Sequence, residues 1–281
     1  MTTLSHPTSG IGNRPDVAVP AVVPPKRPLA DRRFAGIYLP LAAVAIILGL
    51  WELSGFLINR QLISSPKEVA VDFVAQFTNG PAMPALEISL RELYIGLAIG
   101  MGAGLLLGLI IGRYRILGAI FNPFINAANA TPLNVLIPLL IVWVGISTEA
   151  RVLFVVLISF FPVLLNTAGG LRNVSKGYFE VGRMLGLSER QLMRKIILPG
   201  AMPYIFAGIR IGVALGVIGM IVGEIEVSNV GLGYFINFYG QGFQTGKLLA
   251  LIFLAALVGV FNVFIVQGIQ RRWFGWINAA R

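Results

Sequence analysis

The 281-residue sequence contains no cysteine and a single histidine, His6. It therefore has no disulfides, thiolate metal sites or cysteine nucleophile, and we expect neither a metal nor a cofactor. A nucleotide-binding P-loop is also absent. The nearest lookalike, Gly240 to Lys247, has the wrong spacing and lacks the Ser or Thr that would hold magnesium. Because no Ser/His/Asp set or spaced carboxylate pair is present either, we do not expect an enzyme.

Charged residues are scarce as well, at 12% of the chain against 56% hydrophobic residues. This leaves too little polar surface to cover a water-soluble globule of this size. Several apolar stretches of about 20 residues are long enough to cross a bilayer as helices. The sequence thus predicts an all-α integral membrane protein with about six transmembrane helices, near residues 34–57, 90–111, 121–144, 152–168, 204–222 and 248–269.

The net charge of +10 is spread between the apolar runs rather than gathered on one surface, which argues against nucleic-acid binding. If the N-terminus is cytoplasmic, 16 of the 22 basic residues fall in cytoplasmic segments. The positive-inside rule therefore places both termini in the cytosol. We divide the chain into a disordered proline-rich tail (1–33), a first transmembrane helix (34–58), an outer connection (59–85), a membrane core (86–270) and a cytoplasmic C-terminus (271–281).

The outer connection carries the start signal of a short amphipathic helix. Ser65 is the expected N-cap, Pro66 the first helical residue and Glu68 the partner that completes a capping box. Apolar residues then recur at helical spacing, at Val69, Phe73, Val74 and Phe77. Two readings stay open: the helix seals the outer end of the bundle, or it contacts an external partner.

Glycine and proline punctuate the predicted spans. Glycines repeat every four residues from Gly96 to Gly112, and again from Gly208 to Gly216, which favours close helix packing. Three prolines, at positions 123, 132 and 138, predict that the third span is broken or kinked. The break either is an ordinary kink or lines a transport path.

Few ionisable residues fall inside the spans, and such residues are functional candidates by default. They are Glu52 in the first span, Arg210 in the fifth, and Glu224 and Glu226 at its outer end. Glu52 and Arg210 are close enough to a span end to reach an interface instead.

The loop over residues 172–198 is longer and more amphipathic than a simple link requires. Gly186 suits a turn with positive φ, and Ser188 suits the N-cap of a second short helix. We expect two short helices joined at Gly186.

The motif Glu180-Val181-Gly182, then three residues, Gly186, nine residues and Ile196-Ile197-Leu198-Pro199 resembles the EAA loop of binding-protein-dependent ABC importer permeases. Both alanines of that motif are replaced here, by Val181 and Gly182. Flanking segments, such as Leu62 to Pro66 and Phe161 to Asn166, resemble the nitrate, sulfonate and taurine branch.

The resemblance implies a type I ABC importer transmembrane fold that forms the path for a small solute. It also implies two cytoplasmic ATPase subunits, an extracytoplasmic solute-binding protein and a second permease copy, with a homodimer as the expected form. The EAA loop would be the ATPase-coupling segment, through Glu180, Gly186, Leu187, Ser188 and Pro199. One alternative is a secondary transporter, which would need ion-coupling carboxylates near the bilayer midplane and often shows repeated halves, neither of which is evident. Another is a membrane-bound enzyme, against which the scarcity of His, Asp and Cys argues. A membrane scaffold is the third, and it would have no need for this spacing.

Overall fold

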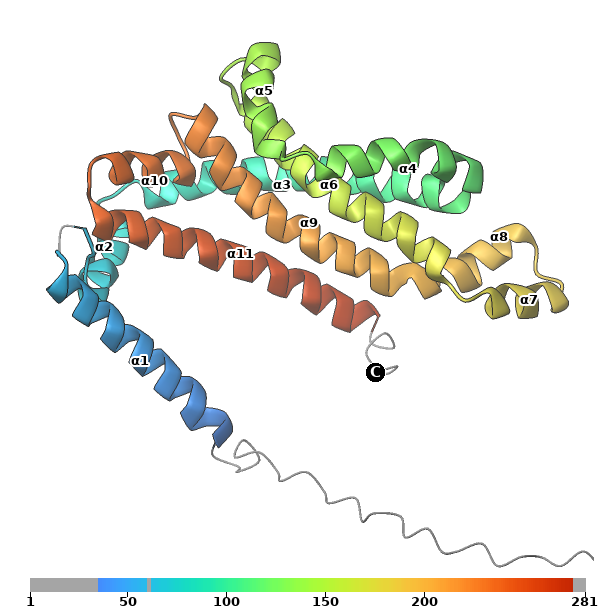
Figure 1. Ribbon diagram of the computed structural model, residues 1–281, viewed down its shortest axis with the longest axis horizontal. Helices are drawn as coiled ribbons and strands as arrows, with labels where there is room; N and C mark the ends of the chain where they lie inside the picture. Colours follow the sequence, from blue (N-terminus) through green and yellow to red (C-terminus); the bar gives the residue numbers. More distant parts are fainter. Residues whose placement is uncertain (1–34, 60–61, 275–281) are drawn as a thin grey trace, which may run out of the picture. The chain divides into compact units, whose positions relative to one another are not determined.

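The computed structural model describes residues 35–59 and 62–274, where all regular elements are helices (Figure 1). The predicted tail over residues 1–33 and the last residues of the predicted C-terminal segment, 275–281, lie outside the described part. The helices are α1 Ala35–Leu57, α2 Pro66–Thr78, α3 Ala82–Arg113, α4 Arg115–Ala130, α5 Ile137–Val144, α6 Thr148–Asn173, α7 Lys176–Met184, α8 Glu189–Leu192, α9 Leu198–Val227, α10 Leu232–Gln241 and α11 Thr245–Trp273. A 3₁₀ turn at Leu133–Leu136 precedes α5, and a π-helical turn at Met193–Ile197 precedes α9.

The chain divides into two units, Met1–Gly49 and Leu50–Arg281, with the boundary inside α1. The described part of the first unit is the apolar beginning of α1. The second unit holds the rest of α1 and the elements from α2 to α11.

Five helical stretches in the described residues are long and apolar enough to cross a membrane. A sixth span arises if α4 and the segment ending with α5, which meet at 88°, are counted as one bent span. The bend falls at Thr131-Pro132, because a residue that precedes proline avoids helical angles, and Thr131 is extended (φ −74°, ψ 129°). The predicted number of spans and the predicted interruption of the third are both confirmed.

Helix α6 packs between α3 and α9, and glycines make both contacts close. A Cβ placed on Gly104 of α3 would lie 2.7 Å from the Phe160 carbonyl oxygen of α6. On the other side, a Cβ on Gly208 of α9 would lie 3.0 Å from the Pro162 carbonyl oxygen. Side chains at these positions would separate the helix backbones, so the packing role predicted for both glycine series is confirmed.

Helices α2, α10 and α11 pack together at one end of the second unit. The predicted start of α2 is confirmed: the Ser65 hydroxyl accepts from the Glu68 amide at 3.2 Å, and the Glu68 carboxylate accepts from the Ser65 amide at 2.9 Å. Val69 is buried and Phe77 joins the core, whereas Val74 is exposed. The pattern was therefore wrong at Val74 alone, and the packing of α2 fits a helix that seals this end.

Several helices are longer than the predicted spans, most of all α3 and α9 at their starts, and one helix was not predicted. Helix α3 begins at Ala82 because Ala82 and Ala85 pack in the core with Leu232 of α10, which extends it beyond the apolar run. Helix α9 follows the π-helical turn directly at Leu198. Helix α10 was not predicted, since its ten residues are too few to give a span signal.

Candidate functional site

The segment between α6 and α9 forms two short helices around Gly186. The backbone of Gly186 has φ +73°, as the sequence predicts, and a Cβ there would meet nothing within 4 Å. The Ser188 hydroxyl accepts from the Gln191 amide at 3.4 Å, and the Gln191 side chain accepts from the Ser188 amide at 2.9 Å. The predicted turn and N-cap are confirmed, and the turn is shaped by the backbone rather than by crowding.

Helix α7 has an exposed apolar face. Tyr178, Val181 and Leu185 follow helical spacing and are 63%, 55% and 74% exposed, and Met184 beside them is 85% exposed. Glu180 is exposed as well. A protein rarely exposes a contiguous apolar patch of this kind unless a partner covers it.

The opposite face of α7 is fastened to the bundle. Gly182 lies where α7 meets the next turn, since a Cβ there would lie 2.5 Å from the Leu192 methyl and 3.5 Å from the Leu187 methyl. Leu187 is half-buried, and Pro199 lies at the first turn of α9. Glu189 pairs with Arg113 at the end of α3 at 2.7 Å. The α7 to α8 segment is thus held by α3 and α9 while its apolar face stays free.

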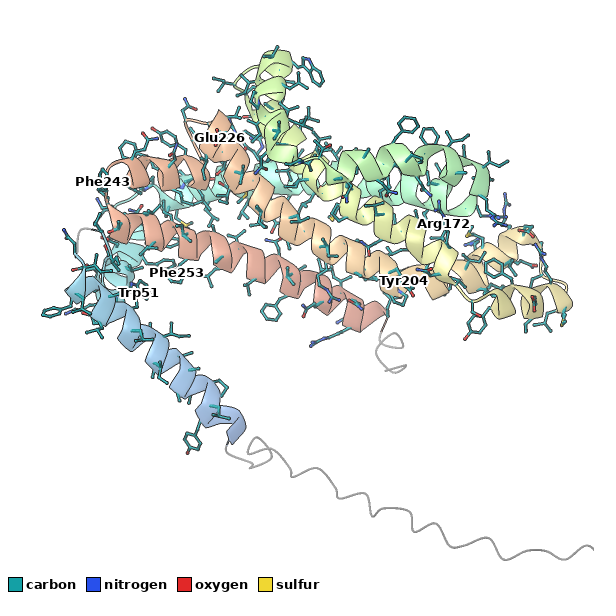
Figure 2. All side chains as sticks on the ribbon, in the orientation of Figure 1. Trp51, Arg172, Tyr204, Glu226, Phe243 and Phe253 are labelled. Carbon is teal, nitrogen blue, oxygen red and sulfur yellow. The ribbon has the colours of Figure 1, made fainter. Side chains whose placement is uncertain are left out.

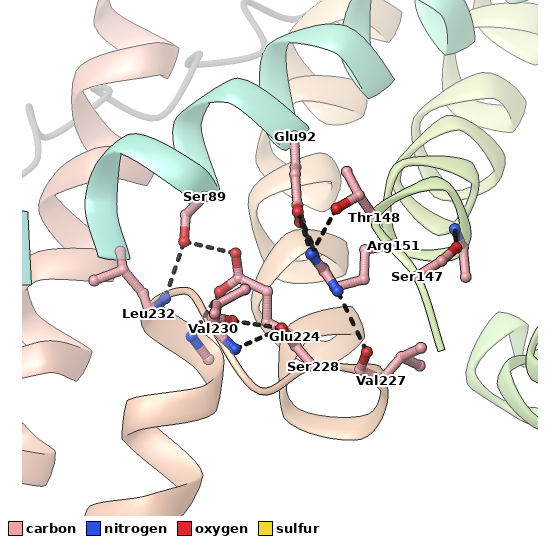
Figure 3. A network of polar contacts seen from close by, with 12 residues as sticks. Ser89, Glu92, Ser147, Thr148, Arg151, Glu224, Val227, Ser228, Val230 and Leu232 are labelled. Carbon is pink, nitrogen blue, oxygen red and sulfur yellow. Dashed lines mark hydrogen bonds and ion pairs between the residues drawn. The ribbon is translucent and has the colours of Figure 1, made fainter. Parts of the chain in front are cut away.

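A cluster of buried polar side chains near α10 links four helices, α3, α6, α9 and α10 (Figure 3). Arg151 of α6 and Glu92 of α3 form an ion pair that is 5% and 2% exposed, with Arg151 Nε 2.9 Å from a Glu92 oxygen. The remaining Arg151 nitrogens donate to the Thr148 hydroxyl at 3.0 Å and to the Val227 carbonyl at 3.4 Å. The buried charges are therefore paired and hydrogen-bonded, as burial in a membrane requires.

Glu224 of α9 belongs to the same cluster and is fully buried. Its carboxyl group accepts from the Ser89 hydroxyl at 2.6 Å and from the Gly233 amide at 2.7 Å. Ser89 in turn accepts from the Leu232 amide at 2.9 Å. Glu224 and Ser89 thereby each accept from one amide at the start of α10, and their own hydrogen bond fixes the turn between α9 and α10 to α3.

The other predicted intramembrane candidates do not join this cluster. Glu52 and Glu226 are exposed, and Figure 2 shows Glu226 and Tyr204 near opposite ends of α9. Arg210 is half-buried and donates to Gln270 of α11 at 2.7 Å. Arg210 therefore bridges two spans, and Glu224 alone of these residues is enclosed.

Sequence reasoning missed Ser89, Glu92 and Arg151. A signal was present, because Glu92 is four residues before Gly96 and continues the spacing of the glycine series that faces α6. Arg151 lies in the first turn of α6 and points into the bundle toward Glu92 (Figure 3). The partner of a buried charged residue can be predicted only when it is known which helices pack against one another. Over the described residues, no group of three His, Cys, Asp or Glu side chains is placed to hold a metal ion.

Comparison with known proteins shows the family of the chain. Residues 100–275, more than half of the chain, match the family model of the binding-protein-dependent transport system inner membrane component. The chain belongs to this family. It is an inner-membrane, multi-pass permease subunit of an ABC importer, which works with ATPase subunits and a binding protein. The chain itself is not an enzyme, and ATP hydrolysis resides in the partner subunits.

The relatives belong to the branch suggested by the sequence. A protein of Escherichia coli assigned as the aliphatic sulfonates transport permease SsuC is 34% identical over 87% of this chain and 92% of its own length. The nitrate import permease NrtB of Synechococcus elongatus is 30% identical over 79% of this chain and 85% of its own. A solved structure of the MetNI methionine ABC transporter is 23% identical, with TM-score 0.45, over 64% of this chain and 91% of that chain. Family membership favours the ABC permease over the secondary transporter.

Proposed function

We propose that this permease carries a small nitrate-, sulfonate- or taurine-like solute inward and that its α7 end couples the membrane helices to ATPase subunits. The exposed apolar face of α7 carries this proposal, because it lies outside the apolar spans and lacks a cover in the described chain. The relatives named for sulfonates and nitrate support the solute class.

The proposed orientation places the α7 end and both termini in the cytosol. The exposed basic residues Arg183, Arg190, Arg194 and Lys195 at that end support it through the positive-inside rule. The α10 end then faces the binding protein.

The proposed coupling segment runs from Glu180 to Pro199. The ATPase would cover Tyr178, Val181, Met184 and Leu185, with Gly186, Leu187 and Ser188 setting the angle between α7 and α8. Movement of the coupling segment would be transmitted to the spans by two routes. One is the ion pair between Glu189 and Arg113, and the other is the continuous helical path into α9. We propose two permease copies, as a homodimer, with two ATPase copies, because the spans of one chain provide only half of a path in this family.

Replacing Gly186 with Val tests the coupling assignment. A β-branched residue at φ +73° is strained, although nothing crowds the side chain. We expect normal insertion, poor co-purification of ATPase subunits and at least a tenfold loss of solute uptake in proteoliposomes that contain the whole complex.

Gly145→Val is the matched control, because Gly145 has φ +79° and an open Cβ position but lies between α5 and α6. It should keep ATPase co-purification, and Arg190→Gln, on an exposed side chain, should be nearly silent. Normal uptake and assembly for Gly186→Val at normal expression would reject the coupling role.

A further inference from the structure

We propose that a polar groove between α6 and α9, bounded by Asn166, Asn173 and Tyr204, is a wall of the solute path in the half of the membrane nearer α7. The solute class that it suits is a small molecule that presents oxygen acceptors. This inference rests on the transport function proposed above and adds the residues along which the solute passes.

The groove has a volume of about 210 Å³, and Leu165, Gly169 and Gly170 complete its lining. Asn166 and Asn173 are seven residues apart on α6, so they stand on one face about 10 Å apart along the helix axis. Tyr204, which Figure 2 shows near the α7 end of α9, faces them from the other helix and is 42% exposed. The two amides therefore lie along the α6 axis, in the part of α6 that leads to α7.

Hydrogen-bonding capacity in the groove is largely unused. One amide N–H of Asn166 donates to the Pro162 carbonyl at 2.8 Å, which leaves its second N–H and its oxygen available. In the part of the chain that the structure describes, the Asn173 amide and the Tyr204 hydroxyl have no side-chain partner. Asn166 lies within the span, where hydrocarbon cannot satisfy its free amide groups, and leaving them unpaired in lipid costs several kcal/mol. Water or a polar solute must therefore occupy the groove.

Two adjacent glycines have opposite roles in shaping it. A Cβ on Gly170 would lie 2.6 Å from the Tyr204 Cβ, so Gly170 lets α9 approach α6. A Cβ on Gly169 would meet nothing within 4 Å, so Gly169 adds nothing to helix packing and keeps the groove open. This open position distinguishes Gly169 from the packing glycines of α3 and α9.

The chemistry of the lining indicates the solute. Amide N–H groups and a phenol O–H donate to oxygen atoms, and no carboxylate lines the groove within the described residues. An oxyanion is thus accepted without repulsion from a fixed negative charge. The volume is below the about 300 Å³ at which enclosed ligand sites begin, which suits a path that must bind weakly enough to release its solute.

Thiol accessibility tests the groove directly, because the natural chain has no cysteine. Asn166→Cys and Gly169→Cys would be made separately in the complete complex with its ATPase and binding protein. Inside-out vesicles would then be treated with a membrane-impermeant maleimide, with and without ATP. We expect at least tenfold faster labelling of both variants than of Leu106→Cys.

Leu106 is the depth-matched control. It lies on α3 between Gly104, which contacts Val163, and Gly108, which contacts Thr167, so it is level with the groove. Its side chain is 64% exposed on an apolar face of α3, which the proposed path leaves against lipid. Labelling of both groove thiols at or below the Leu106→Cys rate, in both nucleotide conditions and in a complex that transports, would overturn the proposal and leave the proposed function standing.

Filling the groove gives a second test. Gly169→Leu should lower uptake at least tenfold while ATPase subunits still co-purify, and Gly102→Leu, another open Cβ position, should retain uptake. Full uptake with Gly169→Leu would overturn the groove. By contrast, a wild-type chain that never assembles with ATPase subunits would refute the proposed function instead.

Discussion

The two ends of the second unit differ in which side chains they bury and which they expose. At the α10 end, Glu92, Arg151 and Glu224 are buried and hydrogen-bonded within the chain. At the α7 end, the charged Glu189 is exposed and the apolar Met184 is exposed as well. The buried charges of the first end are satisfied within the chain, whereas the second end exposes an apolar helix face.

This difference fits the work of an importer subunit. The α10 end ties α3, α6, α9 and α10 into one block through side chains that cannot leave without stranding a buried charge. The α7 end packs against the bundle on one face only, and in the proposed coupling a partner that binds its exposed face would move the block as a unit. In that proposal, force applied at the α7 end would reach the other end of the spans.

Breaking the buried ion pair should have the largest effect. Arg151→Ala leaves the Glu92 carboxylate buried without its partner, which we expect to cost about 3–5 kcal/mol of stability. Thermal unfolding of the detergent-purified chain, together with its yield, would measure this loss.

The comparison variant is Arg183→Ala at the α7 end, where the pair with Glu189 is 3.3 Å long and 70% and 59% exposed. Surface pairs contribute below about 1 kcal/mol, so this variant should unfold at nearly the wild-type temperature. The double variant Glu92→Leu with Arg151→Met removes both charges and should recover much of the loss. Equal effects of Arg151→Ala and Arg183→Ala would contradict the contrast between the two ends.

Gly231→Ala should have an intermediate effect. Gly231 has φ +94°, and a Cβ there would lie 2.5 Å from the Glu224 carboxyl carbon, so alanine adds a clash to backbone strain. Gly145→Ala adds the strain alone, at φ +79° with open space. We expect about 2–3 kcal/mol for Gly231→Ala and about 1 kcal/mol for Gly145→Ala in thermal unfolding. A smaller loss for Gly231→Ala would mean that Glu224 is not fixed against this turn.

The local features of both ends could be predicted from the sequence, but few of the contacts between distant residues could. Gly186, Ser65 and Ser188 were predictable because turns and caps depend on residues within one helical turn. The pairing of Glu92 with Arg151 was not, since 59 positions separate them and only the packing of α3 against α6 brings them together. Helix α10 was missed for a related reason, because contacts with α3 and α9 stabilise it rather than its own length.

The smallest expected effect is the loss of stability when the N-cap serine of either capping box, Ser65 or Ser188, is replaced. Ser65→Ala should lower the free energy of unfolding by about 1 kcal/mol, because Ser65 is 6% exposed and water cannot easily reach the freed Glu68 amide. Ser188 is exposed and caps a helix of four residues, so water replaces its bond and global stability should hardly change. Hydrogen exchange would reveal the difference: the Gln191 amide should exchange faster in Ser188→Ala at an unchanged melting temperature. A melting temperature that falls as far for Ser188→Ala as for Ser65→Ala would show that the α7 end is built into the fold as firmly as the α10 end.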